Sequence, residues 1–583
     1  ADTRGGAILI TLRRRRDGGM DGNLQFSTVQ SNRIAGYTPS GRIGIRTGRW
    51  TLTASGSGSF TPVAESRFTE TREQAGQPLP FAGRSDSKSR TNYGRGHFSA
   101  VFDPTPKHTA GFDIEYTERS THMPTLSRTT LGQTQSDSRY RQHMDGNTLT
   151  ATANYIWKID TLGSQFKLIA DYTRYTSDGD NSYHTTTCAP GTLRDSLYES
   201  ATGSVYDILT ADAGLTRKLP HGLTLRAGLR YTRNDMADKS RYAAQTQGTW
   251  LALPEYSYDQ HYTEQIGAAY ASLEYSAGRW ELSAGLRGEY TSVASQAFGR
   301  SYFGLFPNVS VSRALNALRT WLLVAQWSRN IERPAFPALN PARIRISDYS
   351  WQSGNPSLRP TYIHRFSLTA VWKYRYTLTV GGNLHHDLIR EIAHRDATAP
   401  DAVYIRPENH YTENHWFVAA SVPAKITRWW NLSVNAVGVM QRIRLNSTDS
   451  PATHYLMFAD ATCSFTLPAG FFAEAVYRAQ SRLYSGNSEV GPRHTLSATV
   501  KKQLFGKRLT LFCTLSNITG CDWEFASLTD GMRRTIDTGQ AWSGRLWKVG
   551  AAWNFRTGKK FRARTVESAA ETQRKRLVKS TEQ

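Results

Sequence analysis

The sequence predicts an all-β protein, a transmembrane antiparallel β-barrel of about 22 strands with short periplasmic turns and long extracellular loops. Three observations lead to this prediction. Apolar and polar residues alternate along many runs, the connections between runs are alternately short and long, and Trp and Tyr recur at the ends of runs. Together they indicate strands that cross a bilayer and enclose a wet interior.

The alternation is clearest in residues 280–291, where Trp280, Leu282, Leu286 and Tyr290 share one face and charged or small residues share the other. Alternation over this length exceeds the roughly 5–6 residues of an average soluble strand and suits a strand that is tilted across a bilayer. The same pattern occurs in residues 223–232, 366–374, 376–384 and 547–555.

The connections set the strand number. Ten short turns lie near residues 47–49, 104–107, 159–163, 219–222, 277–279, 314–318, 375, 425–428, 467–470 and 504–507. Longer polar segments, expected to be loops, include residues 61–92, 119–144, 177–203, 236–260, 329–360, 391–410 and 518–540. Ten turns pair 20 strands, and a first strand at 22–31 and a last at 541–555 make 22. An even number lets the sheet close without an exposed edge.

Composition agrees with one apolar and one wet face per sheet. Hydrophobic residues make up 39% and aromatic residues 11%, and the mean hydropathy is −0.51. The sequence contains no run of about 18 apolar residues, so it predicts no transmembrane helix. The net charge of +23 is spread along the chain, apart from four arginines at 13–16 and a basic tail after Phe555. We interpret these clusters as solvated or headgroup-facing surface, and expect no nucleic-acid partner.

Two sets of residues have expected places in the barrel. Aromatic rings at headgroup depth form a girdle, predicted to include Trp50, Trp157, Trp280, Trp429, Trp430 and Trp547. Charged residues on the polar face of a strand must point into the lumen, because a mid-membrane arginine facing lipid costs about 2–4 kcal/mol. The predicted lumen-facing residues, expected to form mainly inter-strand ion pairs, are Arg226, Arg230, Arg287, Glu289 and Lys373.

No catalytic constellation, cofactor site or metal site is predicted, and the protein is expected not to be an enzyme. The candidates for a metal site are His385, His386 and Asp387 with His410 and His415. Solvated loop histidines explain them better, since a metal site needs convergent geometry and supporting contacts. His184 and Cys188 are interpreted in the same way, and a Cys513–Cys521 disulfide is left open. A soluble β-propeller is the alternative fold, but the sequence has no blade repeat.

A proline-rich segment carries a family resemblance. Its three parts are Arg333-Pro334, then Leu339-Asn340-Pro341, then Gly354-Asn355-Pro356-Ser357-Leu358-Arg359-Pro360. This pattern resembles one shared by TonB-dependent receptors, in the branch whose precursors carry a carboxypeptidase-regulatory-like domain. One departure is Thr361, where the family usually has an acidic residue. The resemblance implies that this segment is an extracellular loop before a barrel strand.

Both ends of the chain extend the resemblance. Residues 5–11 resemble the last strand of the plug domain, and the run SNITGCDWEF with WKVGAAWNFRTGKK resembles the family's last two strands. The expected organisation is therefore the end of a plug and a connector at 1–21, the barrel at 22–555, and a basic, poorly ordered periplasmic tail at 556–583. The rest of the plug and its TonB box are expected in a longer precursor.

The implied function is that of an outer-membrane receptor and transporter in a Gram-negative bacterium, importing a scarce siderophore, vitamin, glycan or peptide. Its implied partners are outer-membrane lipid, an extracellular ligand and the TonB complex. The alternative is a barrel that acts as a scaffold, adhesin or assembly partner for another protein, or as a passive pore if it has no plug. The ligand cannot be read from the sequence.

Overall fold

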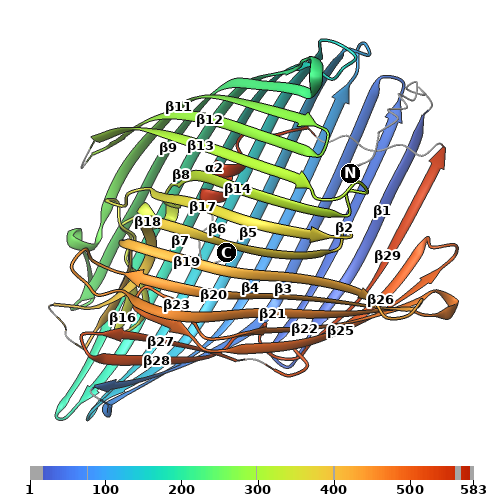
Figure 1. Ribbon diagram of the computed structural model, residues 1–583. Coiled ribbons are helices and arrows are strands. Elements are labelled where there is room, and N and C mark those ends of the chain that lie inside the picture. The colour runs from blue at the N-terminus through green and yellow to red at the C-terminus, as the bar shows by residue number, and fades with distance from the viewer. Residues whose placement is uncertain are drawn as a thin grey trace.

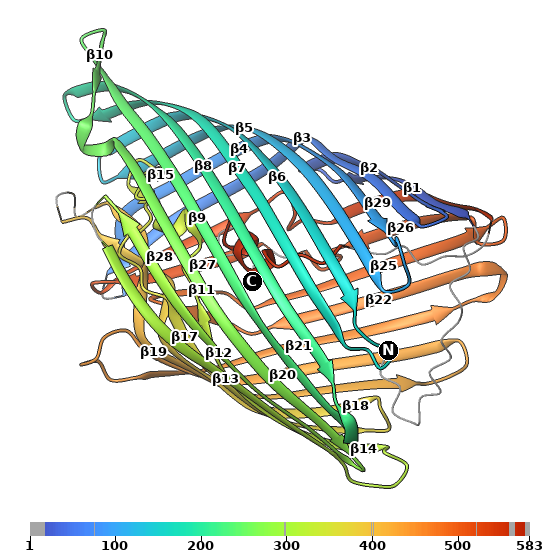
Figure 2. The ribbon, with the colours of Figure 1, turned by 90° about the horizontal axis from the view of Figure 1, so that it is seen from above.

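The computed structural model describes residues 18–74, 76–296, 299–397, 399, 401–520, 522–558 and 566–577. Within these residues, 22 antiparallel strands form one closed β-barrel, seen from the side in Figure 1 and from above in Figure 2. None of the helices in these ranges is long and apolar enough to span a membrane. Residues 5–11, the expected end of the plug, lie outside the described residues, as does Cys521.

The barrel strands follow one another around the ring in chain order. They are β1 (Gly19–Gln30), β2 (Ile34–Thr47), β3 (Trp50–Gln74), β4 (Gln77–Phe102), β5 (His108–Leu131), β6 (Thr134–Lys158), β7 (Gln165–Ala189), β8 (Thr192–Lys218), β9 (Leu223–Thr246), β11 (Tyr258–Ala277), β12 (Trp280–Ser295), β13 (Gly299–Ala314), β14 (Trp321–Glu332), β17 (Thr361–Trp372), β18 (Tyr376–Arg395), β19 (Val403–Lys425), β20 (Trp430–Arg444), β21 (Ala452–Thr466), β22 (Phe471–Gln480), β25 (Arg493–Leu504), β26 (Leu509–Ser516) and β29 (Leu546–Gly558).

Shorter elements lie in the connections and near the C-terminus. The short strands are β10 (Thr249–Ala252), β15 (Ile344–Ser347), β16 (Ser350–Gln352), β23 (Leu483–Ser485), β24 (Ser488–Val490), β27 (Trp523–Thr529) and β28 (Met532–Gly539). The helices are α1 (Phe336–Leu339), α2 (Glu571–Arg574) and the 3-10 turns η1 (Pro220–Gly222), η2 (Pro254–Tyr256), η3 (Pro468–Gly470) and η4 (Lys575–Leu577).

Pairing of the first and last strands closes the barrel. β1 and β29 run antiparallel in unbroken register from Gly19 opposite Gly558 to Gln30 opposite Trp547. The closed sheet leaves no unpaired edge to face hydrocarbon. The barrel therefore begins and ends about three residues outside the predicted 22–555.

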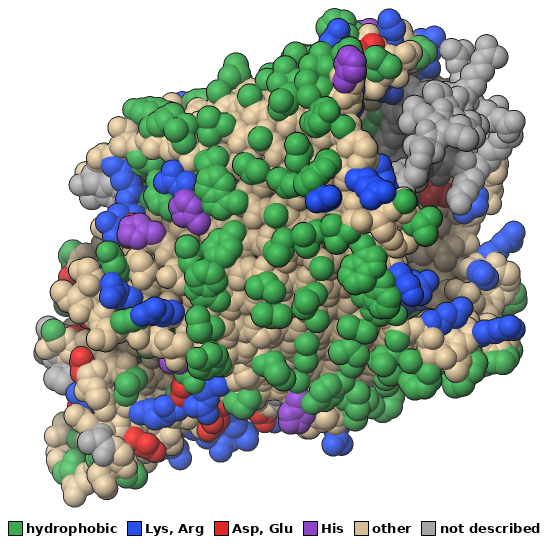
Figure 3. Space-filling view, in the orientation of Figure 1, with side chains coloured by type: hydrophobic (Ala, Val, Ile, Leu, Met, Phe, Trp, Pro, Cys, Tyr) green, Lys and Arg blue, Asp and Glu red, His purple; other side chains and the backbone are tan. Residues whose placement is uncertain are grey.

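The predicted alternation is confirmed in the strand that shows it best. In β12, Leu286 and Tyr290 are exposed on the outside, at 48% and 54%, whereas Thr291 and Val293 are buried inside. Figure 3 shows hydrophobic side chains spread over the middle of the visible outer face, with charged side chains gathered toward its ends. The outer face thus has the apolar band that a bilayer requires.

The ten short turns fall where the sequence predicts them, but the opposite side differs. Most of 61–92, 119–144 and 177–203 is strand, because β3 to β8 are 24 to 27 residues long. Their hairpins extend past the neighbouring strands at the lower left of Figure 1. Polar side chains on both faces resemble a loop in the sequence, but cross-strand pairs such as Arg67–Asp86 (2.6 Å) and Arg128–Asp137 (2.6 Å) accompany a regular ladder.

The main apolar cluster lies inside the barrel. Inward-facing residues of the wall meet residues of the β14–β17 connection there: Tyr206, Ile208, Met236, Tyr262, Val293, Phe336, Leu339 and Leu358. Burying one such side chain stabilises the fold by about 1.5–3 kcal/mol. The wide lumen is therefore partly filled by the chain's own connection, which positions the candidate site.

The lipid-facing assignment predicts an asymmetric response to charge. Leu229 is 65% exposed on the outer face of β9, so Leu229→Arg should lower the free energy of unfolding by about 2–4 kcal/mol. Asn308→Arg is the matched control, because Asn308 lies on the inward face of β13 opposite Gly285 and should have a much smaller effect. Denaturant unfolding in lipid vesicles measures both, and equal losses would contradict the assigned faces.

Candidate functional site

The β14–β17 connection, residues 333–360, folds inward at the extracellular end of the barrel; we call it the motif loop. It carries α1, β15 and β16, and the residues that resemble the family pattern lie within it. The sequence predicts a loop that holds one shape outside the hydrocarbon. The structure adds that much of this loop is buried against the inner wall.

Arg333 is the first anchor of the motif loop. Its side chain is 9% exposed, and its Nη2 lies 2.7 Å from Glu289 Oε2 and donates to Thr291 Oγ1 at 2.8 Å. Its Nε lies 3.9 Å from Glu264 Oε1. A buried guanidinium is stable only with such partners, and removing one partner of a buried pair costs about 3–5 kcal/mol.

The apolar anchors follow directly. Phe336 is 1% exposed, Leu339 3% and Leu358 0%, and all three belong to the lumenal cluster. Pro334 and Pro360 are buried beside them. The apolar anchors of the motif loop therefore converge on one cluster inside the barrel.

Backbone packing explains the Asn and Gly positions. Asn340 Nδ2 donates to Asp238 at 3.0 Å, and its Oδ1 accepts from Tyr258 at 2.6 Å. Gly354 N donates to the Asn340 carbonyl at 2.9 Å. A Cβ on Gly354 would lie 2.8 Å from the Ala338 carbonyl oxygen and closer still to that of Asn340, so only glycine fits there.

The third part of the pattern also makes contacts outside the loop. Asn355 Nδ2 donates to the Pro407 carbonyl at 3.0 Å, which joins the loop to β19. Thr361, the departure from the family pattern, is 1% exposed and donates through Oγ1 to the Asp387 carbonyl at 2.9 Å. In this chain the Thr361 hydroxyl therefore joins the start of β17 to β18. Pro341 and Pro356 are partly buried and shape the turns between anchors.

One buried carboxylate, that of Asp348, joins the β15–β16 hairpin to the barrel wall. Asp348 accepts hydrogen bonds from Ser138 at 2.5 Å, Tyr140 at 2.9 Å and Thr185 at 3.0 Å, and pairs with Arg345 at 2.7 Å. Burial alone would lower the pKa of Arg345, but the Asp348 carboxylate helps to hold that pKa above its ordinary value. Sequence reasoning missed Asp348, because its three hydrogen-bond partners on the barrel wall lie about 160 to 210 residues away.

A second buried ion cluster ties the hairpin to other connections. Glu70 of β3 pairs with Arg72 at 2.8 Å and with Arg534 of β28 at 2.8 Å. Arg534 also donates to Ser350 at 3.0 Å. Each member is at most 9% exposed. Several extracellular connections therefore pack on one another at the mouth.

Four of the predicted lumenal charges lie on the inward faces of strands, and their pairs are inter-strand or local. Arg230 lies 2.8 Å from Asp212, Arg287 lies 2.5 Å from Glu289, and Arg226 pairs with Glu274. The placement of Lys373 on a strand face is wrong, since β17 ends at Trp372. Lys373 lies in the following turn with its Nζ 4.4 Å from the Trp372 ring centroid.

The predicted girdle divides between the two rims. The tryptophans at the short-turn ends of strands or in the adjoining turn are Trp50, Trp157, Trp280, Trp429 and Trp430, whereas Trp547 lies at the opposite end, near the start of β29. Trp50 and Trp547 are 44% and 52% exposed. Their contact with lipid headgroups stays a prediction.

The histidines differ from the expected solvated loop. His410 and His415 belong to β19, and His410 is 1% exposed beside Glu413, which is fully buried. Glu413 pairs with His415 at 2.8 Å and with Arg390 at 2.9 Å. Within the described ranges, no group of three or more His, Cys, Asp and Glu residues is arranged to hold a metal ion.

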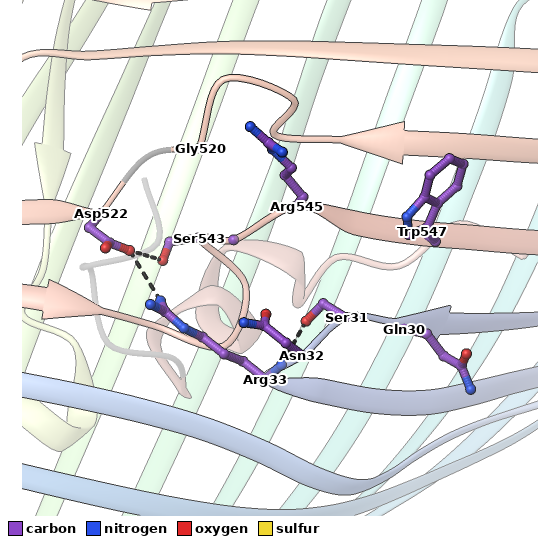
Figure 4. Close-up of a pocket in the computed structure, with 10 residues that line it drawn as sticks. Gln30, Ser31, Asn32, Arg33, Gly520, Asp522, Ser543, Arg545 and Trp547 are labelled. Atoms are coloured by element: carbon purple, nitrogen blue, oxygen red, sulfur yellow. Dashed lines mark hydrogen bonds and ion pairs between the residues drawn. The ribbon is translucent and has the colours of Figure 1, made fainter.

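The remaining candidates lie at the hairpin tips and at the rim. His184 lies 3.4 Å from Asp195, and Cys188 is exposed with a free thiol, while the thiol of Cys513 is also free. A hollow of about 770 Å³ at the rim, between the β1–β2 and β26–β29 connections, was not predicted from the sequence. In Figure 4, Arg33 points to Asp522, 3.2 Å away, which also accepts a hydrogen bond from Ser543 at 2.9 Å.

A known protein family and solved structures share this architecture. A sequence model described as "Outer membrane protein beta-barrel family" matches residues 157–550. A ferric enterobactin receptor of Pseudomonas aeruginosa is similar in structure, with a TM-score of 0.57 and 14% identity over 93% of this chain and 81% of the receptor. No curated protein sequence matches this chain.

Two further solved structures are similar. The siderophore receptor PirA of Pseudomonas aeruginosa has a TM-score of 0.55 and 12% identity, over 93% of this chain and 81% of its own. The copper transporter OprC has a TM-score of 0.58 and 12% identity, over 93% of this chain and 82% of its own. At these identities the likeness shows a shared fold.

The packing around Gly354 predicts a sensitive position. Gly354→Ala should displace the motif loop and lower the free energy of unfolding by about 1–3 kcal/mol, because the added methyl group overpacks the site. Gly438→Ala is the matched control, since a Cβ there meets nothing within 4 Å. Thermal unfolding in detergent micelles compares the two, and an unchanged Gly354→Ala chain would contradict the packing.

Proposed function

Since the chain belongs to the Outer membrane protein beta-barrel family, we propose that this outer-membrane barrel is a non-enzymatic receptor and transporter of the TonB-dependent type. It imports a scarce nutrient that binds at the extracellular mouth. The fold that it shares with a ferric enterobactin receptor, a siderophore receptor and a copper transporter supports an uptake role. Each of those ligands belongs to the named protein and is not assigned to this chain.

One observation carries this proposal: the motif loop is built into the mouth of a 22-strand barrel. Barrels of this size enclose a wide lumen, and outer-membrane transporters of 22 strands keep it plugged. Arg333, Phe336, Leu358 and Asp348 anchor this loop inside the barrel. A restricted mouth suits capture of one ligand followed by gated passage.

In this proposal, energy comes from the TonB complex through a plug domain. The support is the resemblance of residues 5–11 to the last plug strand. A second function is favoured by the long hairpins of β3 to β8, whose polar faces extend past neighbouring strands. They offer a surface on which another protein can assemble, and such a role is compatible with transport.

Growth tests the transport proposal. A Gram-negative host that carries the chain should grow on one limiting source among ferric siderophores, vitamins, glycans and peptides. The same host with an empty vector should not grow, and deletion of the TonB system should abolish the growth. Uptake that continues unchanged without TonB would contradict energised import and favour the pore or the assembly role.

A further inference from the structure

A segment near the C-terminus lies inside the barrel. Residues 566–577, which we call the lumenal segment, include α2 and η4; both ribbon views place α2 within the ring of strands. Glu567 pairs with Lys167 of β7 at 2.6 Å. The backbone N–H groups of Ala569 and Ala570 donate to Asp171 of β7 at 2.6 and 3.2 Å. For these residues the expected periplasmic, poorly ordered tail is wrong.

The segment places one arginine in a built pocket. Arg576 Nη1 lies 2.5 Å from Glu264 Oε2, and its Nε donates to the Pro334 carbonyl at 3.0 Å. Its Cζ lies 4.2 Å from the ring centroid of Phe336. Arg576 is 6% exposed and Glu264 2%. A carboxylate, a carbonyl and an aromatic face are together the groups that recognise a planar guanidinium.

The pocket walls are held without the lumenal segment. Asn234 of β9 donates to Glu264 at 2.8 Å, and Arg333 lies 3.9 Å from the same carboxylate. Phe336 is fixed in the lumenal apolar cluster. Without Arg576, the Glu264 carboxylate would lose its nearest cationic partner and keep only Arg333, 3.9 Å away, so its charge would be incompletely compensated, which is unfavourable. The pocket would therefore favour another cation of the same shape.

In the part of the chain that the structure describes, the charged side chains next to Arg576 make no such contact with the wall. The side chains of Lys575 and Glu571 are 66% and 71% exposed and pair with each other at 3.1 Å. Arg574 donates to Ser568 within the segment at 2.8 Å. Of the three consecutive basic residues, Arg576 alone is buried. Among the basic residues of the segment, recognition by the wall and the motif loop therefore rests on Arg576.

We propose that Glu264, Pro334 and Phe336 form a guanidinium-binding subsite of the lumen, which the chain's own residues 566–577 occupy and which an arginine-bearing peptide can occupy in their place. The subsite joins the barrel wall to the motif loop, so its occupant contacts both. This inference goes beyond the proposed function, because it concerns binding and requires neither TonB nor transport. A failed growth test would leave this inference intact. A failed peptide-binding test would likewise leave the proposed transport function intact.

The probe is a labelled synthetic peptide with the sequence of residues 566–577, VESAAETQRKRL. Fluorescence anisotropy measures its binding to the chain of residues 1–583 in detergent micelles. The Arg576→Ala chain should bind it on the order of 30-fold more tightly than the wild-type chain, because the competing internal arginine is absent. Lys575→Ala is the matched control and should behave as the wild type, since Lys575 is exposed in the same segment.

Three further measurements test whether the pocket recognises a guanidinium group. A peptide with Gln at the position of Arg576 should bind the Arg576→Ala chain on the order of 30-fold more weakly than VESAAETQRKRL. In a chain that carries both Glu264→Gln and Arg576→Ala, this preference for arginine should disappear. Arginine amide should compete with the labelled peptide for the Arg576→Ala chain.

The outcomes that overturn the proposal are equally definite. Equal binding of the Arg and Gln peptides, or equal binding of peptide by the Arg576→Ala and Lys575→Ala chains, would mean that the pocket serves only to anchor the segment. Each variant is first checked for a folded barrel by comparing the gel mobility of boiled and unboiled samples. If Arg576→Ala does not fold, Arg576→Gln replaces it, since glutamine keeps more of the side-chain volume.

Discussion

The rest of this structure depends on complete pairing of the backbone in a medium that offers no hydrogen bonds. A sheet that spans hydrocarbon must close, because each unpaired N–H or C=O group would cost several kcal/mol. β1 and β29 meet this requirement in continuous register from Gly19–Gly558 to Gln30–Trp547. In a closed barrel, every strand has one face toward lipid and one toward the lumen. Apolar side chains are therefore favoured on the outer face and polar side chains on the inner face.

A ring of 22 strands creates a second problem, because its interior is too wide for wall side chains to fill. Here the chain uses its own connections. The motif loop carries Phe336 and Leu358 into the lumen, and the lumenal segment adds Arg576 beside Glu264. Charges buried in this way are paired, as with Arg333 and Glu289, so the interior is packed without losing its polar character.

Residue patterns predict what local geometry dictates. The period of two in β12 gives its lipid-facing residues, and turn residues give the ten short connections. The extended strands were missed because the polar faces of residues 61–92 look like a loop, although a regular ladder pairs them. The buried anchors were missed for a different reason. Tyr140, which binds Asp348, and Glu264, which binds Arg576, come from distant strands, and a basic tail or loop carboxylate gives no local sign of burial.

Accessibility of two neighbouring residues tests the inward-folded motif loop most directly. Ser357 is exposed, whereas Leu358 has 0% exposure. In a chain whose native cysteines are replaced by serine, Ser357→Cys and Leu358→Cys can each be treated on intact cells with a membrane-impermeant maleimide. The structure predicts rapid labelling at position 357 and little at position 358. Equal labelling of both positions would contradict a motif loop that is packed into the barrel.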